Sequence, residues 1–297
     1  MGWRYAAFMF TLCLFLASIV SLWLAGLNLG LDFEGGLLVE ARAAQPVEIG
    51  DLREQLGTAG LSGLSLQSFG DDREVLIRAH LAPGSEADQK QTIGAIKAVL
   101  GPSFDIRRSE FIGPQVSQEL LADGITASAL AVLLIGVYVW FRFEWQFGLA
   151  ALVTTLHDVV VVFGMFSLLR LEFDLTSVAA ILTVAGYSIN DTVVVFDRMR
   201  ENLRRYKKMG LAELINLSIN QTLTRTILTS GTTMLAVVSL LVFGGPVLRN
   251  FSAALAWGIA IGTYSSIFVA AAMLLLFPAV RQFGSDDADE TTEELNG

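Results

Sequence analysis

Residues 185–196 read AGYSINDTVVVF, and this stretch places Asn190 and Asp191 inside an otherwise apolar run. The run belongs to a longer apolar segment, 175–196, and about 20 such residues are enough to cross a lipid bilayer as a helix. Five further segments have the same character: 5–27, 124–141, 147–169, 214–243 and 251–280. Helices satisfy their own backbone polar groups in lipid. The sequence therefore predicts a polytopic α-helical membrane protein with six transmembrane helices.

The N-terminal segment is predicted to be the first of these helices, within residues 1–27. It is too long for the apolar core of a cleaved signal peptide, and no Ala-x-Ala cleavage site follows it. We therefore expect the segment to be retained. Cys13, the single cysteine of the chain, lies within it, so an intrachain disulfide is excluded.

Lysine and arginine residues predict the orientation of the helices. The loop 198–213 carries six of them, whereas the connections after the third and fifth spans carry one each, Arg170 and Arg249. Short loops rich in positive charge stay in the cytoplasm. Both termini are therefore expected in the cytoplasm, and residues 28–123 outside.

The external segment 28–123 is predicted to be a small α+β domain. Its strands are expected at 37–42, 65–69, 74–79 and 104–110, and its helices at 47–59 and 85–100. The order βαββαβ is typical of a ferredoxin-like arrangement. Acidic residues outnumber basic ones here, which argues against a nucleic-acid partner. Residues 124–281 hold the other five transmembrane helices, and the acidic tail 282–297 is predicted to be disordered.

Four titratable side chains lie within the predicted spans: His157, Asp158, Asp191 and Arg225. An ionised group in mid-membrane costs at least about 2.5–3.5 kcal/mol, so such groups usually find partners. Asp191 and Arg225 lie at similar depths on consecutive antiparallel spans, which predicts that they approach each other. Tyr187 and Asn190 lie beside Asp191. A polar stripe is predicted on the fifth span, formed by Ser218, Thr222, Arg225, Thr229 and Thr232.

Two interpretations of the Asp191 and Arg225 pair follow. It is either a structural salt bridge that fixes helix packing or a proton relay. In the relay, apolar surroundings favour the neutral carboxyl group and a nearby guanidinium favours the carboxylate, so movement of Arg225 would load and unload a proton. One charge crossing the membrane gains about 2.3 kcal/mol per 100 mV, which is enough to bias a conformational change.

His157 and Asp158 are adjacent, and adjacent helical residues point about 100° apart, so we expect them not to share one face. Asp158 either supports the relay or is a neutral, hydrogen-bonded group. His157 is predicted to be a buried, neutral hydrogen-bonding residue. The spans lack a convincing cluster of metal ligands, and the chain lacks a glycine-rich phosphate loop. The sequence therefore predicts no metal, no cofactor and no use of ATP.

Six motifs in order resemble the SecD/SecF family of bacterial protein-export membrane proteins. They are LDFEGG (31–36), GPQVSQEL (113–120), His157-Asp158, GYSINDTVVVFDR (186–198), RTILTSGTT (225–233) and GTYSSIF (262–268). The resemblance covers nearly the whole chain. Its motif positions include Asp32, Gly35, Gly36 and Gly186, and the chain departs from the family at Leu37, where threonine is common.

The resemblance implies a twelve-span assembly similar to the resistance–nodulation–division transporters, of which this chain supplies one half and SecD the other. The family uses the proton-motive force to help unfolded polypeptides leave the SecYEG channel, and YajC and membrane lipid are further expected partners. The assembly lies in the bacterial inner membrane and is not an enzyme. The family's functional carboxylate and arginine correspond to Asp191 and Arg225, with Asp158, Asn190, Tyr187 and Thr229 as possible support.

Two other function classes stay open on the sequence. The chain could be a half-transporter of the same superfamily for a small molecule or lipid, although the small outer domain and the LDFEGG opening argue against this. It could also be a scaffold that stabilises a complex without transporting anything. The Asp191 and Arg225 pair argues against a scaffold.

Overall fold

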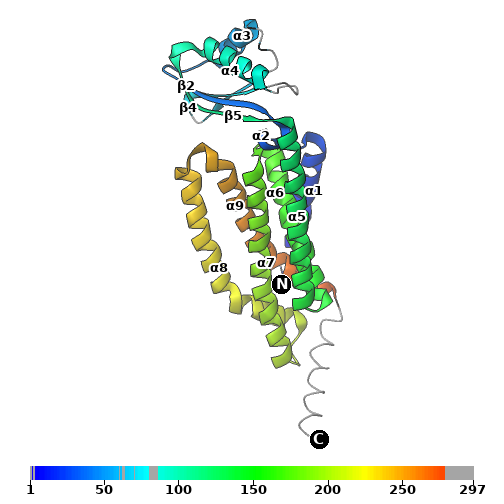
Figure 1. Ribbon diagram of the computed structural model, residues 1–297. Coiled ribbons are helices and arrows are strands. Elements are labelled where there is room, and N and C mark those ends of the chain that lie inside the picture. The colour runs from blue at the N-terminus through cyan, green and yellow to red at the C-terminus, as the bar shows by residue number, and fades with distance from the viewer. Residues whose placement is uncertain are drawn as a thin grey trace. The chain divides into compact units, whose positions relative to one another are not determined.

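A computed structural model describes residues 2, 4–59, 61, 64–69, 71–79 and 86–277. The chain forms two compact units, one made of Met1–Asn28 with Ala127–Gly297 and one made of Leu29–Thr126. Figure 1 shows the membrane-type helices of the first unit and the small sheet of the second. The predicted acidic tail 282–297 lies outside the described residues.

Among the described residues, six helices are long and apolar enough to cross a membrane, which confirms the predicted number. The first five are α1 (Arg4–Ala25), α5 (Pro114–Arg142), α6 (Trp145–Leu169), α7 (Leu175–Arg205) and α8 (Leu211–Phe243). The sixth span, Val247–Leu276, is built from α9 (Gly245–Ser265), η2 (Ser266–Ala270), α10 (Ala271–Met273) and η3 (Leu274–Leu276). Helix α7 continues nine residues beyond its predicted end at residue 196, into the basic segment.

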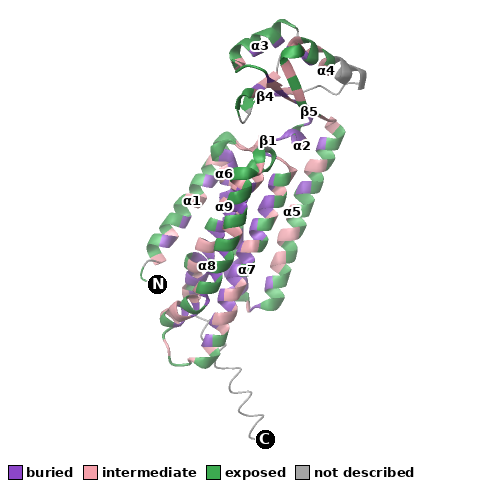
Figure 2. Ribbon diagram, turned by 90° about the vertical axis from the view of Figure 1, so that its left-hand side faces the viewer, coloured by how far each residue is buried: buried purple, intermediate pink, exposed green. Residues whose placement is uncertain are grey.

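Buried residues are concentrated on α6, α7 and the last span, whereas α1 and α8 are largely exposed (Figure 2). Small residues allow these helices to approach closely. A Cβ atom placed on Gly258 of α9 would lie 2.2 Å from Val184 Cγ2 on α7. One on Gly164 of α6 would lie 2.2 Å from Ser18 Oγ on α1. Close backbone approach of this kind drives helix association in lipid, where the hydrophobic effect between helices is absent.

The last span is not a uniform α-helix, because η2 is a π-helical segment. Single π turns inside α-helices are rare and occur frequently at functional sites. The π segment begins at Ser266, whose hydroxyl group is 2.9 Å from Thr192 Oγ1 on α7. The irregular turn therefore lies at a buried polar contact between two spans.

The second unit contains the six elements expected from the sequence, in the predicted order. They are β2 (Gly36–Ala43), α3 (Ile49–Thr58), β3 (Leu64–Phe69), β4 (Asp71–Ala79), α4 (Glu86–Leu100) and β5 (Phe104–Ile112), with the short η1 (Gly101–Ser103) before β5. The sheet order is β3-β4-β2-β5, and each neighbouring pair is antiparallel. Alternate residues of the central strand β2, such as Leu37 and Val39, form its core together with Leu52, Leu56 and Ile96 of the two helices. Two-residue strands β1 (Asn28–Leu29) and β6 (Glu172–Phe173) complete the described strands.

The LDFEGG motif forms the short helix α2 (Leu31–Glu34) and the turn that starts β2. Gly35 and Gly36 have φ angles of 72° and 114°, which L-residues rarely adopt. A Cβ atom on Gly35 would also lie 3.0 Å from the Oγ atom of buried Ser117 and 3.2 Å from the carbonyl oxygen of Ile112. Position 35 therefore favours glycine for two reasons: the backbone has a positive φ angle, and neighbouring atoms leave little room for a Cβ atom.

Candidate functional site

Asp191 lies in the middle of α7 with its side chain turned into the helix bundle, and the residue is only 3% exposed. Ser230 of α8 donates a long hydrogen bond to Asp191 Oδ2, 3.5 Å between the oxygen atoms. The same hydroxyl group is 2.8 Å from Thr263 Oγ1 of α9. One carboxylate and two hydroxyl groups thus join three spans in a buried polar chain.

Arg225 of α8 is exposed on the surface of the helix bundle. Within the described residues, no carboxylate oxygen lies within 4.0 Å of its guanidinium group. Thr229, one turn further along, is also exposed, and its hydroxyl group donates to the backbone oxygen atoms of Arg225 and Thr226. The predicted approach of Arg225 to Asp191 is therefore not an ion pair in the structure, and the arginine side chain is available to another partner.

The polar stripe predicted on the fifth span is only partly buried in the structure. Its buried face has hydroxyl residues four apart: Ser218, Thr222, Thr226 and Ser230. Arg225, Thr229 and Thr232 are exposed. Thr222 and Arg225 are three residues apart, so their side chains lie only about 60° apart around the helix, and the arginine is on the exposed side of the same stripe.

Asp158 of α6 is completely buried and lies at the centre of a second polar cluster. Its Oδ2 atom accepts hydrogen bonds from Ser188 of α7, at 2.6 Å, and from Ser265 of α9, at 2.7 Å. Its Oδ1 atom is 2.9 Å from Nδ1 of His157. Three spans thus meet at one carboxylate.

His157 is 7% exposed, and its ring stacks on Phe15 of α1 with 5.9 Å between ring centroids. His157 and Asp158 face different neighbouring helices, as expected, but their side chains are in contact. Although their Cβ atoms diverge, rotation about the side-chain bonds brings Nδ1 to Oδ1. The prediction of a buried, hydrogen-bonding histidine is confirmed. Its Nε2 atom is buried and has no hydrogen-bond partner within the part of the chain that is described.

The remaining predicted site residues of α7 lie at or near its surface. Asn190 and Gly186 are exposed, and a Cβ atom on Gly186 would have nothing within 4 Å. Tyr187 is partly buried, and its hydroxyl group has no hydrogen-bond partner among the described residues. Helix α7 therefore turns Asp191 inward and presents a polar, open strip containing Gly186 and Asn190 outward.

Four hydroxyl residues of the two carboxylate clusters were not among the residues predicted from the sequence. They are Ser188, Ser230, Thr263 and Ser265. Two features of the sequence could have pointed to these hydroxyl residues. Hydroxyl residues recur every four positions from 218 to 230, and two consecutive serines interrupt the apolar last span. Where the structure describes the chain, no three His, Cys, Asp or Glu side chains gather as metal ligands would.

Comparison with known proteins gives consistent matches along the chain. The family model described as protein export membrane protein SecD/SecF, C-terminal, matches residues 92–279, and the SecD/SecF GG motif matches residues 20–47. The protein translocase subunit SecF of Rickettsia akari is 43% identical over 96% of this chain and 93% of its own length. That of Vibrio alginolyticus is 44% identical over 93% of this chain and 88% of its own.

Two solved structures of SecDF have the same fold over this region. The crystal structure from Thermus thermophilus matches 93% of this chain with a TM-score of 0.84 and 38% identity. A SecDF structure in a super-membrane-facing form matches 99% of it with a TM-score of 0.68 and 36% identity. The chain spans only 38% and 40% of those two longer chains. These matches in sequence and structure show that the chain belongs to the SecF family of protein translocase subunits.

Proposed function

We propose that this chain is the SecF half of a SecDF-type assembly, which uses the proton-motive force to help exported polypeptides leave the SecYEG channel. The observation that carries the proposal is the buried carboxylate of Asp191 inside a membrane span, with Arg225 on the neighbouring span α8 and no ion pair between them. Ionisable groups inside a membrane protein are functional sites by default. Both groups also correspond to the family's functional carboxylate and arginine.

The hydroxyl groups around Asp191 suit a carboxyl group that changes its protonation state. A hydroxyl group donates to a carboxylate and accepts from a protonated carboxyl group. Rotation of its hydrogen atom therefore lets Ser230 bond to both forms of Asp191, and Thr263 can accept from Ser230 or donate to it in turn. Approach of Arg225 would favour release of the proton, and its withdrawal would favour uptake. Comparing export with and without a proton gradient, in parent and Asp191→Asn membranes, tests the relay.

We also assign the second unit a ferredoxin-like fold and a place outside the cytoplasm. The sheet order β3-β4-β2-β5, with two helices after its first and third strands, supports the ferredoxin-like arrangement. The basic segment after α7 supports the location, because it favours the cytoplasm and leaves the segment between α1 and α5 on the other side.

This topology predicts which side of the membrane labels two exposed positions. In a Cys13→Ser background, we expect an impermeant thiol reagent added outside to label Ser68→Cys in the second unit. Arg204→Cys, at the end of α7, should react only after the membrane is opened. Both parent residues are exposed, so access to the reagent depends on the membrane alone. Labelling of Arg204→Cys from outside, with Ser68→Cys protected, would reverse the topology.

A SecD-type partner is expected to cover the outward strip of α7. The hydrocarbon interior of a bilayer cannot hydrogen-bond to Asn190 or pair with Arg225, whereas a second six-span chain can do both. Because Gly186 is open, Gly186→Trp should leave the fold of this chain intact and sharply reduce the partner recovered by co-purification. Leu12→Trp on α1, where the parent leucine is 57% exposed, is the matched control. Equal recovery of the partner with Gly186→Trp and the control would place the interface elsewhere.

A further inference from the structure

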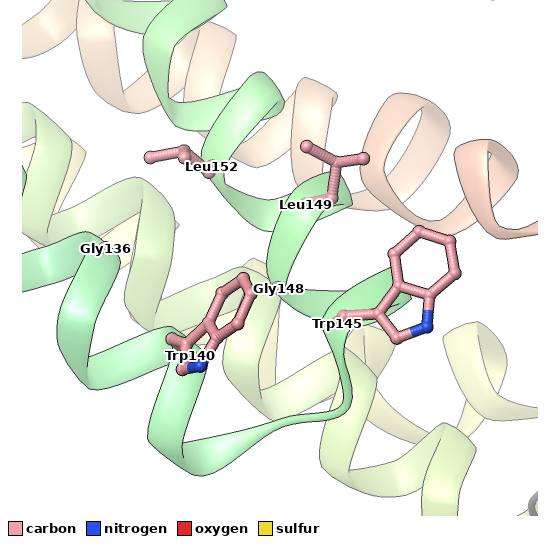
Figure 3. Close-up of a pocket in the computed structure, with 6 residues that line it drawn as sticks. All are labelled: Gly136, Trp140, Trp145, Gly148, Leu149 and Leu152. Atoms are coloured by element: carbon pink, nitrogen blue, oxygen red, sulfur yellow. The ribbon is translucent and has the colours of Figure 1, made fainter.

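A groove with an almost entirely apolar lining lies between α5 and α6, next to the turn that joins them (Figure 3). Its volume is about 260 Å³, and it is lined by Gly136, Trp140, Trp145, Gly148, Leu149 and Leu152. Trp140, Trp145 and Leu149 are 69%, 51% and 42% exposed, so the groove opens at the outer surface of the helices. None of these residues belongs to the carboxylate clusters described above.

Two glycines create this space while the helices remain in contact beside it. A Cβ atom on Gly136 would lie 3.9 Å from Leu152 Cδ1, and one on Gly148 would lie 3.7 Å from Val139 Cγ1. Both are ordinary van der Waals distances, so alanine would fit at either position. A longer side chain at Gly136, which itself lines the groove, would have to occupy the groove volume.

The position of the groove determines what surrounds it. Both helices are membrane spans, and the outer surface of a span faces hydrocarbon. From Trp145 to Leu152 an α-helix rises about 10 Å, which is less than the roughly 15 Å of hydrocarbon that one leaflet supplies. The groove therefore lies within a single leaflet, the one next to the basic segment of α7. Trp140 and Trp145 suit this position, because tryptophan is enriched near the membrane–water interface.

The turn beside the groove carries a cation with spare hydrogen-bond donors. Arg142 uses its Nη2 atom to bind both carboxylate oxygens of Asp197, at 2.6 and 2.7 Å. Its Nε and Nη1 atoms have no hydrogen-bond acceptor among the described residues, and its side chain is 39% exposed. The nearby end of α7 adds further positive charge, with Arg204, Arg205, Lys207 and Lys208 all exposed. An anionic phosphate is the complementary group for such a surface.

We propose that this groove binds one acyl chain of an anionic phospholipid from the leaflet on the basic side, with the lipid phosphate beside Arg142. The proposal rests on the membrane topology proposed above and is independent of the proton relay. The bound chain would cover Trp140, Trp145 and Leu149, which the described protein leaves exposed. It would also fill the space that the two glycines leave between α5 and α6.

Photo-crosslinking tests the site. The full-length protein is placed in nanodiscs of phosphatidylglycerol that contain a trace of phosphatidylglycerol with a diazirine on one acyl chain, and labelled peptides are mapped by mass spectrometry. We expect labelling to concentrate on 136–152. Each buried methylene group favours binding about fourfold, so Gly136→Leu, which displaces two or more, should lower this labelling about tenfold.

Two control variants keep the outcome interpretable. Gly136→Ala fits the groove and should label as the parent does, whereas Gly231→Leu adds the same side chain at an exposed, open position of α8. Labelling of 136–152 no stronger than that of exposed α8 would overturn the site, and so would equal labelling of Gly136→Leu and parent. Protection of the groove by a co-purified partner chain would likewise overturn it, because protein would then be the occupant. None of these readouts measures export.

Discussion

Asp191→Asn is expected to assemble with its partner in normal amounts and to lose the acceleration of late export that a proton gradient provides. Asparagine keeps the shape of the side chain and an oxygen atom for the Ser230 hydroxyl group, but it cannot ionise. One proton moving through 100 mV supplies about 2.3 kcal/mol, which limits the acceleration per proton to roughly 50-fold. The measurement is the rate of late translocation in membranes with matched amounts of complex, with and without a gradient.

Two companion variants separate the relay from a structural salt bridge. Ser230→Ala removes a long hydrogen bond but keeps the carboxyl group, so it should retain a gradient response. Arg225→Lys keeps the charge and loses the planar fork of the guanidinium, so it should be impaired. A structural pair would behave differently, because Asp191→Asn would then reduce stability and assembly. If Asp191→Asn responds to the gradient as the parent does, the relay through Asp191 is refuted. Asp158 or the partner chain must then carry the proton.

The second large effect is expected at Asp158, where substitution by alanine should destabilise the helix bundle itself. The change removes three hydrogen bonds and leaves the buried hydroxyl groups of Ser188 and Ser265 without this acceptor. Hydrogen bonds between membrane helices average about 0.6 kcal/mol and reach about 1.7 kcal/mol. A loss of roughly 2–4 kcal/mol in the free energy of unfolding is therefore expected. Thermal or denaturant unfolding of the purified protein in detergent measures it.

Asp158→Asn is the matched control, because its remaining oxygen atom can still accept from both serines. It should unfold much closer to the parent than Asp158→Ala does. An alanine variant as stable as the parent would show that the cluster does not hold the three spans together. The asparagine variant also resolves the alternative left open by the sequence. If it is stable but loses the gradient response, Asp158 takes part in proton transfer, and if it keeps the response, its role is structural.

The sequence predicts the elements of this fold well, because each depends on a local pattern. Apolar length determines the six spans, strand-forming residues identify 37–42, and the turn signal at 70–72 identifies the strands on either side of it. The faces of the helices are less predictable. Arg225 and Ser230 are both polar residues of one span, and only the packing of α8 against α7 and α9 decides that Ser230 meets Asp191 while Arg225 points outward. The contact of His157 with Asp158 depends on side-chain rotation, which no residue spacing reports.

The π-helical segment η2 is the point at which the register of the last span could change. A π turn holds one residue more than an α turn, so its conversion to regular α-helix would rotate the chain beyond it by about 100° and shift it by about 1.5 Å along the axis. Ser265, hydrogen-bonded to Asp158, would stay in place on the near side. Ser266 and the residues up to Leu276 would turn away from Thr192. Loss of the two contacts that the Ser266 hydroxyl group makes with Thr192 and Ser188, inside the membrane, would in this way rotate and shift the end of the span at the membrane surface.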